Sequence, residues 1–522
     1  MPRLLPFVAA LAAGLLQAGS LAWPWNGQPQ WWLQILSLAV LAAVLQGRPG
    51  WRGAALAGWL FAVAWLAGTF WWLFISMHVY GGLSALLAAL AVLLLAAFLG
   101  LYYGAAAGVA RGLAIGGALR DAVLFAAAWT LAELLRVTWF TGFPWGAGGY
   151  AHVDGPLAAL APWVGVHGIG ALAAGLAWLL SLLVRGETRR SPRYWLAVAA
   201  AAGLLTACNM TTDRASAPSA APRLTVALLQ GNIPQDEKFE GGTGIPLALQ
   251  WYGRELVKAR ASLVVAPETA IPLLPQQLPA GYMDALRQRF ASGDRAAMVG
   301  VPLGSFSGGY SNSVLAFKPG DAGYRYDKHH LVPFGEFIPP LFKWFTRMMN
   351  IPLGDFDRGG VGQSSFAWRG ERFAPNVCYE DLFGEELGAR FRDPTQAPTV
   401  FVNVSNIAWF GDTVAIDQHL QISRMRALEF SRPMIRATNT GATVIIDRAG
   451  RVTHALPRLT RGVLLGEVQG GRGITPYAWW IARLGLWPLW IGALAVAGLA
   501  WWARRRRGPP YNEWFREPPA RA

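Results

Sequence analysis

The chain contains 522 residues, of which 54% are hydrophobic and only 14% are charged, and 26 of them are tryptophan. This composition excludes an ordinary soluble enzyme and indicates a membrane protein. The formal net charge of +15 would suit a nucleic-acid binder. However, much of the basic charge lies beside apolar segments, and no basic stripe interleaved with aromatic residues occurs elsewhere, so we expect no nucleic-acid partner.

Apolar segments long enough to cross about 30 Å of hydrocarbon recur along the chain. Their positions predict a membrane domain at residues 1–210 with seven transmembrane helices, a further transmembrane helix at 479–503, and a basic tail at 504–522. The eight predicted spans lie near residues 4–23, 30–47, 54–76, 82–108, 121–140, 162–184, 193–210 and 479–503.

The arginines beside these segments predict how the chain is oriented, because positively charged connections remain on the cytoplasmic side. The short connections at 24–29 and 77–81 hold no Lys or Arg, so they are assigned to the opposite side. Both termini and the tail are then cytoplasmic, and the large polar domain is periplasmic. The arginines that carry this prediction are Arg48, Arg52, Arg111, Arg120, Arg185, Arg189, Arg190, Arg193, Arg504, Arg505, Arg506 and Arg507.

Residues 223–470 have a different composition and a different hydrophobic pattern, which predict one α/β domain. The segment 211–222, rich in Ser, Thr, Ala and Pro, is predicted to be the linker that precedes it. About 250 residues are enough to bury one sizeable core. Helical patterns separate several short β-branched runs. The predicted strands are 224–229, 263–266, 297–301, 312–317, 373–377, 400–404 and 442–446.

Three polar residues in this domain lie at predicted strand ends or beside a loop, which are common positions for catalytic side chains. Glu268 ends the apolar run 262–267, and Cys378 ends the run 372–377. Both runs are typical of strands, and open α/β sheets place ligands at the carboxyl ends of their strands. Lys328 precedes a loop that contains Pro and Gly.

The three residue types suit acyl transfer through a thioester. A thiol is a weak nucleophile until a base takes its proton, and the tetrahedral oxyanion that follows needs a fixed positive charge. We therefore predict Glu268 as the base, Lys328 as the oxyanion partner and Cys378 as the nucleophile. Alone, each residue has an ordinary alternative, namely a surface charge for Glu268 and Lys328 or a small core side chain for Cys378.

The motifs Pro267-Glu268 and Cys378-Tyr379-Glu380, together with Lys328, resemble the nitrilase superfamily of carbon-nitrogen hydrolases. The longer segments 328–336 and 403–412 resemble the apolipoprotein N-acyltransferase family, a membrane-embedded branch of that superfamily. Segments 142–145 and 162–168 share this resemblance, so it extends across most of the chain.

The resemblance implies an αββα sandwich attached to a helical membrane bundle, in a bacterial inner membrane. It also implies a ping-pong reaction without a metal or an organic cofactor. An acyl chain passes from a phospholipid such as phosphatidylethanolamine to Cys378, and then to the α-amine of a diacylglyceryl-cysteine apolipoprotein. Glu336, Tyr379 and Glu380 are expected to support the site. For Tyr379, oxyanion binding and ordinary core packing remain open.

Aromatic residues near these motifs are candidates for contact with lipid. Phe239 stands where the family commonly has Trp, so the apolar area is kept and the indole N–H is lost. Trp344 and Phe345 in one loop, and Trp409 and Phe410 in another, are predicted to form arms over a cleft that faces the membrane. Packing within the domain is the alternative.

Other functions remain open from the sequence alone. A membrane-tethered amidase would pass the acyl group to water, although one anchoring helix would be sufficient for it. A transporter or inactive scaffold is opposed by the complete set of three catalytic residues and by sparse charge within the spans, where Glu133 is the main example. A Cys-His protease using His329 or His330 is opposed by the absence of the local cysteine motifs of those families.

Overall fold

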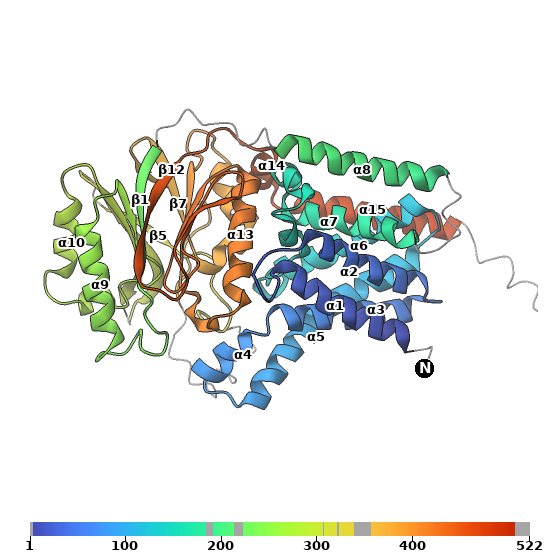
Figure 1. The fold of residues 1–522 in the computed structure, drawn as a ribbon, viewed down its shortest axis with the longest axis horizontal. Helices are drawn as coiled ribbons and strands as arrows, with labels where there is room; N and C mark the ends of the chain where they lie inside the picture. The colour runs from blue at the N-terminus through green and yellow to red at the C-terminus, as the bar shows by residue number, and fades with distance from the viewer. Residues whose placement is uncertain are drawn as a thin grey trace, which may run out of the picture.

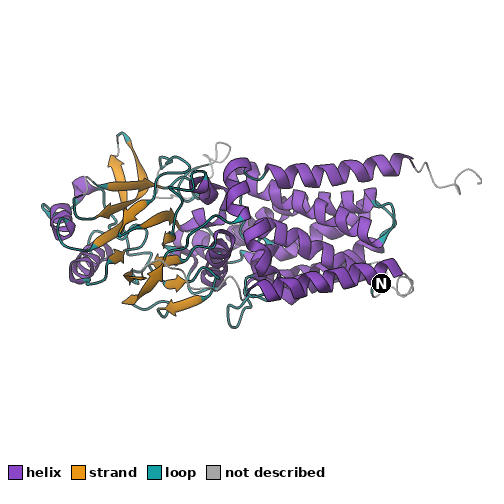
Figure 2. Cartoon of the chain, turned by 90° about the horizontal axis from the view of Figure 1, so that it is seen from above, coloured by secondary structure: helices purple, strands orange, loops and turns teal. Residues whose placement is uncertain are grey.

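The computed structural model describes residues 4–183, 192–212, 223–305, 307–320, 323–338 and 356–506. The chain forms an elongated molecule with a layered α/β part at one end and a bundle of nearly parallel helices at the other (Figures 1 and 2). The helices of the bundle are α1 (Leu5–Leu21), α2 (Trp31–Gln46), α3 (Trp51–Thr69), α4 (Leu73–Ile75), α5 (Ala85–Leu113), α6 (Ala118–Thr138), α7 (Ala161–Leu182), α8 (Pro192–Thr212) and α15 (Trp487–Arg506).

The prediction of an apolar helical part is confirmed, but its count of eight spans is met only in part. Among the described residues, three helices are long and apolar enough to cross a membrane, at 85–113, 118–141 and 156–182. Two further candidates, 51–80 and 476–506, qualify only as bent pairs, with bends of 62° and 86°. Helices α1 and α2 are apolar but have 17 and 16 residues. At a rise of about 1.5 Å per residue, they are shorter than about 30 Å of hydrocarbon.

Within the described residues, the strands form two six-stranded sheets. The first has the order β12 (Gly462–Gln469), β1 (Arg223–Gln230), β2 (Leu263–Val265), β3 (Ala296–Ser305), β4 (Gly309–Phe317), β5 (Tyr324–Asp327). The second has the order β11 (Val452–Ala455), β10 (Val444–Ile446), β9 (Met434–Thr438), β8 (Val400–Ser405), β7 (Glu371–Val377), β6 (Phe366–Trp368). Strands β1, β2 and β3 are parallel, as are β7, β8 and β9, so each sheet has a central set of strands ending at one edge.

The sheets pack face to face through buried β-branched and aliphatic side chains such as Val226, Val265, Val377 and Val402. Helices α9 (Gly244–Lys258) and α10 (Tyr282–Phe290) cover the outer face of the first sheet (Figure 1). The helices α12 (Gly384–Gly388), α13 (Val414–Phe430) and α14 (Pro476–Leu484) cover the second sheet. The predicted αββα sandwich is therefore present.

The sandwich and the bundle share one apolar core. Side chains of α13, including Ile422 and Met425, belong to the same buried cluster as Trp65 and Trp129 of the bundle. Polar contacts cross the same seam, because both Trp72 Nε1 and Trp145 Nε1 donate to Gln418 Oε1, at 3.0 and 2.8 Å. Helix α13 therefore serves as a common layer between the two parts.

Candidate active site

Glu268, Lys328 and Cys378 follow three different strands, and the strands belong to both sheets. Glu268 comes shortly after β2, and Lys328 directly follows β5 in the same sheet. Cys378 directly follows β7 of the opposite sheet. The sequence placed Glu268 and Cys378 at the ends of strands, and the face-to-face packing of the two sheets brings the three side chains together.

Hydrogen bonds from both sheets hold the carboxylate of Glu268. Asn312 Nδ2, on β4, donates to Glu268 Oε1 at 2.7 Å, and the main-chain N–H of Asn406, just after β8, donates to Oε2 at 2.8 Å. Lys328 Nζ lies 3.5 Å from Oε1. The side chain is 7% exposed, so this carboxylate is nearly enclosed and is fixed in direction.

Lys328 is fully buried and lies between two carboxylates. Its Nζ is 2.8 Å from Glu336 Oε2 and 3.5 Å from Glu268 Oε1. Burial alone would lower the pKa of Lys328, but the carboxylates of Glu336 and Glu268 outweigh it and hold this pKa above its usual value. The ammonium therefore remains charged, as an oxyanion partner must.

Cys378 is half-buried, in contrast to its enclosed neighbours, and its backbone is left-handed with φ 51°. Its carbonyl oxygen accepts a hydrogen bond from Asn403 Nδ2 at 3.4 Å and lies 3.2 Å from His419 Nε2. These contacts hold the sharp turn that places the thiol at the end of β7. Such a backbone is uncommon outside glycine and clusters at functional sites.

Burial and, to a lesser degree, the Glu268 carboxylate together raise the pKa of the Cys378 thiol to about 12, although the charge of Lys328 acts to lower it. In the resting site, the thiol therefore keeps its proton. Transfer of this proton to Glu268 moves one negative charge across the site without changing the total. The arrangement can generate a thiolate at the moment when an acyl group is in place.

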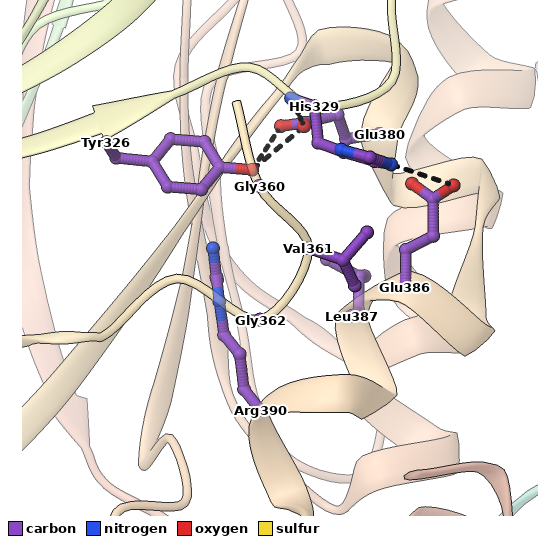
Figure 3. A pocket seen from close by; sticks show the side chains of 9 residues that line it. All are labelled: Tyr326, His329, Gly360, Val361, Gly362, Glu380, Glu386, Leu387 and Arg390. Atoms are coloured by element: carbon purple, nitrogen blue, oxygen red, sulfur yellow. Dashed lines mark hydrogen bonds and ion pairs between the residues drawn. The ribbon is translucent and has the colours of Figure 1, made fainter. Parts of the chain in front are cut away.

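Glu380 supports the structure around the thiol. Both of its carboxylate oxygens lie 2.8 Å from the hydroxyl of Tyr326, and the main-chain N–H groups of His329 and Val377 donate to it at 2.6 Å each. Figure 3 shows this carboxylate in a small pocket beside His329, whose Nε2 is 3.8 Å from Glu386. Glu380 thus ties the segment after β5 to the end of β7.

Tyr379 connects the nucleophile to the membrane part. Its hydroxyl donates to the carbonyl of Gly142 at 3.0 Å, and Arg136 holds the same loop by donating to the carbonyls of Phe143 and Trp145, at 3.1 and 2.6 Å. The hydroxyl is therefore occupied at the seam. The ring is 3% exposed and belongs to the apolar core that the sandwich shares with the bundle, and a part in oxyanion binding stays a prediction.

The predicted lipid-contacting aromatic residues lie in different settings. Phe239 is 42% exposed. Trp409 and Phe410 are half-buried, and their rings lie 5.7 Å from Tyr80 and 4.2 Å from Trp72, so the tip of this loop packs on the helical part. Trp344 and Phe345 lie outside the described residues, and their role as an arm stays a prediction.

Two polar residues at the site were not found from the sequence. Asn312 bridges Glu268 and Glu336, donating to their Oε1 atoms at 2.7 and 2.8 Å. Lys238 is 2% exposed, and its Nζ donates to the main-chain carbonyl of Glu268 at 3.2 Å. Asn312 lies between two serines in the polar half of its strand, and Lys238 lies among other charged residues, so no local pattern distinguishes either of them.

Among the described residues, no group of three or more His, Cys, Asp or Glu side chains is placed to hold a metal ion. The chemistry assembled here depends on a carboxylate, an ammonium and a thiol.

Comparison with known proteins assigns both parts of the molecule. The pattern of the apolipoprotein N-acyltransferase N-terminal domain matches residues 13–179, and that of carbon-nitrogen hydrolases matches residues 225–474. An apolipoprotein N-acyltransferase from Verminephrobacter eiseniae is 61% identical over 498 residues, which are 91% of this chain and 92% of the relative. The chain belongs to the apolipoprotein N-acyltransferase family.

Other members of this family are similarly complete matches. The apolipoprotein N-acyltransferase of Ralstonia nicotianae is 48% identical, covering 96% of this chain and 94% of its own length. Among solved structures, an amidase of the nitrilase superfamily from Nesterenkonia AN1 covers 52% of this chain at 19% identity, with a TM-score of 0.36. The match to relatives thus spans the bundle as well as the sandwich.

Proposed function

We propose that this chain is an acyltransferase that moves an acyl chain from a phospholipid, through a thioester on Cys378, to the α-amine of a diacylglyceryl-cysteine apolipoprotein. One observation carries the proposal. A half-buried thiol lies with a buried carboxylate and a buried ammonium at the seam between a nitrilase-like sandwich and an apolar bundle. Family membership supports the same reading.

In the first half of the reaction, Glu268 takes the proton of Cys378 and the thiolate attacks the carbonyl carbon of a phospholipid ester. Lys328 stabilises the oxyanion of the tetrahedral intermediate. The carbon–oxygen bond of the ester then breaks, and the lysophospholipid alkoxide leaves with the proton from Glu268. A thioester remains on Cys378.

In the second half, the neutral α-amine of the apolipoprotein attacks the thioester carbonyl. Glu268 accepts a proton from the amine, and Lys328 again stabilises the oxyanion. The carbon–sulfur bond breaks, and the proton passes from Glu268 to sulfur, which restores the thiol. The product is an amide, so the lipoprotein carries a third acyl chain.

The finer parts of the proposal concern the membrane. We assign eight transmembrane segments, residues 1–210 to a membrane domain, 223–470 to a periplasmic catalytic domain, 479–503 to the last span and 504–522 to a cytoplasmic tail. The near-parallel helices of the bundle support spans that share one layer, even where a single helix is short (Figure 2). The distribution of arginines supports cytoplasmic termini in a bacterial inner membrane.

The donor is assigned as phosphatidylethanolamine, which reaches the thiol from the side of the bundle. Phe239, Trp409 and Phe410, with Trp344 and Phe345, are assigned to contact with its acyl chains. Exposure of the Phe239 ring supports this assignment for that residue. The packing of Phe410 on Trp72 supports a place for the other loop beside the bundle.

The intact mass of the purified protein after incubation with phosphatidylethanolamine tests the proposal. The expected result is an added acyl mass that is absent in Cys378→Ala and is discharged by a diacylglyceryl-cysteine peptide with formation of an amide. Release of free fatty acid without amide formation would favour a tethered amidase. No adduct on folded, lipid-binding protein would contradict the mechanism.

A further inference from the structure

Lys238 is a buried lysine attached to the segment that carries Glu268. It lies between β1 and α9 and is 2% exposed, while the next residue, Phe239, is 42% exposed. Its Nζ donates to the main-chain carbonyl of Glu268 at 3.2 Å and to the hydroxyl of Thr269 at 2.6 Å. Lysine is almost never fully buried unless its charge is paired, so this position requires an explanation.

The contacts of Lys238 fix the turn on which Glu268 stands. Thr269 has φ 46°, a left-handed conformation that is uncommon for a threonine and must be held by its surroundings. Lys238 bonds to atoms of both residues that form this turn. One ammonium therefore restrains the backbone of the predicted base, while Asn312 and Asn406 restrain its carboxylate.

The balance of charge in the site points the same way. Glu268 and Glu336 are buried carboxylates, and Lys328 is the ammonium that lies between them. These three groups have a net charge of −1, which stays in the site when it moves from Glu268 to sulfur. A second buried ammonium beside Glu268 offsets this charge, and a buried charge is costly unless it is compensated.

The charges that act on Lys238 are those of the catalytic residues. The pKa of Lys238 is lowered to about 8, because the effect of burial outweighs the charges of Glu268 and Cys378, which act to raise it. Of the acidic residues in its own segment, Asp236 and Glu240 are exposed and Glu237 is half-buried. The ammonium thus interacts with the carboxylate and the sulfur that exchange the proton.

We propose that Lys238 is a positioning residue that fixes the turn bearing Glu268 and supplies the second positive charge for the thiolate of Cys378. This inference rests on the proposed cysteine mechanism. Lys238 acts through Glu268 and through the local electrostatic potential, and Lys328 remains the oxyanion partner.

The rate at which iodoacetamide alkylates Cys378, measured from pH 6 to 10 in the full-length protein, tests this role without any acyl transfer. Lys238→Met removes the charge and keeps the length of the side chain. Because the pKa of Lys238 is about 8, its charge is present mainly below that pH, so we expect alkylation of the variant to be about tenfold slower at pH 6–7 and the difference to disappear by pH 10. Acylation by phospholipid should fall at least as much.

Two matched variants separate the charge from the hydrogen bonds. Thr269→Val removes one partner of the ammonium and leaves its charge, so acylation should slow while the pH profile of alkylation stays in place. Lys258→Met, on the exposed end of α9, should behave as the wild type in both assays. Thermal unfolding of each variant in detergent shows whether the protein is folded.

A folded Lys238→Met protein with the wild-type pH profile would overturn the proposal. If Lys238→Met does not fold, wild-type acylation by Thr269→Val would overturn it instead, because the turn would then not depend on this contact. The alkylation experiment can fail independently of the proposed acyltransferase function. A wild-type protein that is alkylated normally but forms no thioester with phospholipid would refute the acyltransferase and leave the role of Lys238 to the alkylation result.

Discussion

Replacing Asn312 by Ala should slow acylation of Cys378, although the side chain of Asn312 donates to Glu268 and Glu336 and not to the thiol. Its side-chain N–H₂ group donates to Glu268 at 2.7 Å and to Glu336 at 2.8 Å. Without these bonds, the carboxylate of Glu268 is free to turn toward Lys328 Nζ, which is already 3.5 Å away. The base would then be drawn away from the thiol and into an ion pair.

The size of the effect follows from the two contacts. A hydrogen bond to a charged group contributes about 1.5–3 kcal/mol, and water that fills the space of the lost side chain replaces part of this. Taking about 2 kcal/mol for the pair, the rate of acylation should fall about 30-fold. The measurement is the time course of thioester formation by intact mass, in a single turnover with excess phosphatidylethanolamine.

Ser313→Ala is the matched control for this variant. Ser313 is the next residue of β4, is equally buried, and donates to Asp327 Oδ1 at 2.6 Å on the opposite face of the strand. It should lower stability without slowing acylation by more than about threefold. The reasoning is refuted if Asn312→Ala acylates within about threefold of the wild type, or if Ser313→Ala loses as much activity.

Three further predictions concern the ammonium, the thiol and the seam. Lys328→Met should reduce the rate of thioester formation by about 10²–10³, because the proposed oxyanion partner is lost, while Cys378→Ala should form none. The pKa of Cys378 is about 12 in the folded protein and 9.0 in a free thiol, so between these values only the unfolded chain loses its proton. The free energy of unfolding should therefore fall as pH rises from about 9 to about 12. In denaturation curves of Cys378→Ala, this pH dependence should be absent. Gln418→Leu leaves the indole N–H groups of Trp72 and Trp145 without their acceptor, and each unpaired group should lower the free energy of unfolding by about 1–3 kcal/mol. The midpoint of thermal unfolding in detergent should therefore be lower than in the wild type. An unchanged midpoint would contradict the contact described between α13 and the bundle.

The strands that the sequence predicted are rich in apolar and β-branched residues. Strand β9 was missed because Met434–Thr438 contains Arg436, a charge that normally argues against a buried strand. In the fold, Arg436 lies 3.5 Å from Asp381 and also contacts Ser423, so its charge is neutralised by residues distant in sequence. Strand β11 was missed for the opposite reason, because Val452–Ala455 is wholly exposed and has no apolar pattern.

The same distinction separates what was predicted about the site from what was not. Glu268 and Cys378 were identifiable because each ends an apolar strand, which is a local pattern. The sequence could not show that they come from opposing sheets, since the pairing of strands depends on contacts across the whole domain. Lys238 owes its importance to a carbonyl 30 residues away, and only the folded chain brings the two together.

The core that α13 shares with the bundle has a mechanical consequence. Tyr379, next to Cys378, belongs to the same cluster as Trp65 and Trp129 of the bundle, so the thiol is fastened at one height relative to the helices. The reacting groups of the donor and of the acceptor must both reach this position along the axis of the bundle. In the proposed reaction, the phospholipid is already held there by the bilayer, whereas an apolipoprotein anchored by its first residue needs a length of unfolded chain between that residue and its folded part. A fixed thiol therefore requires that the acceptor proteins have an unfolded segment after their first residue.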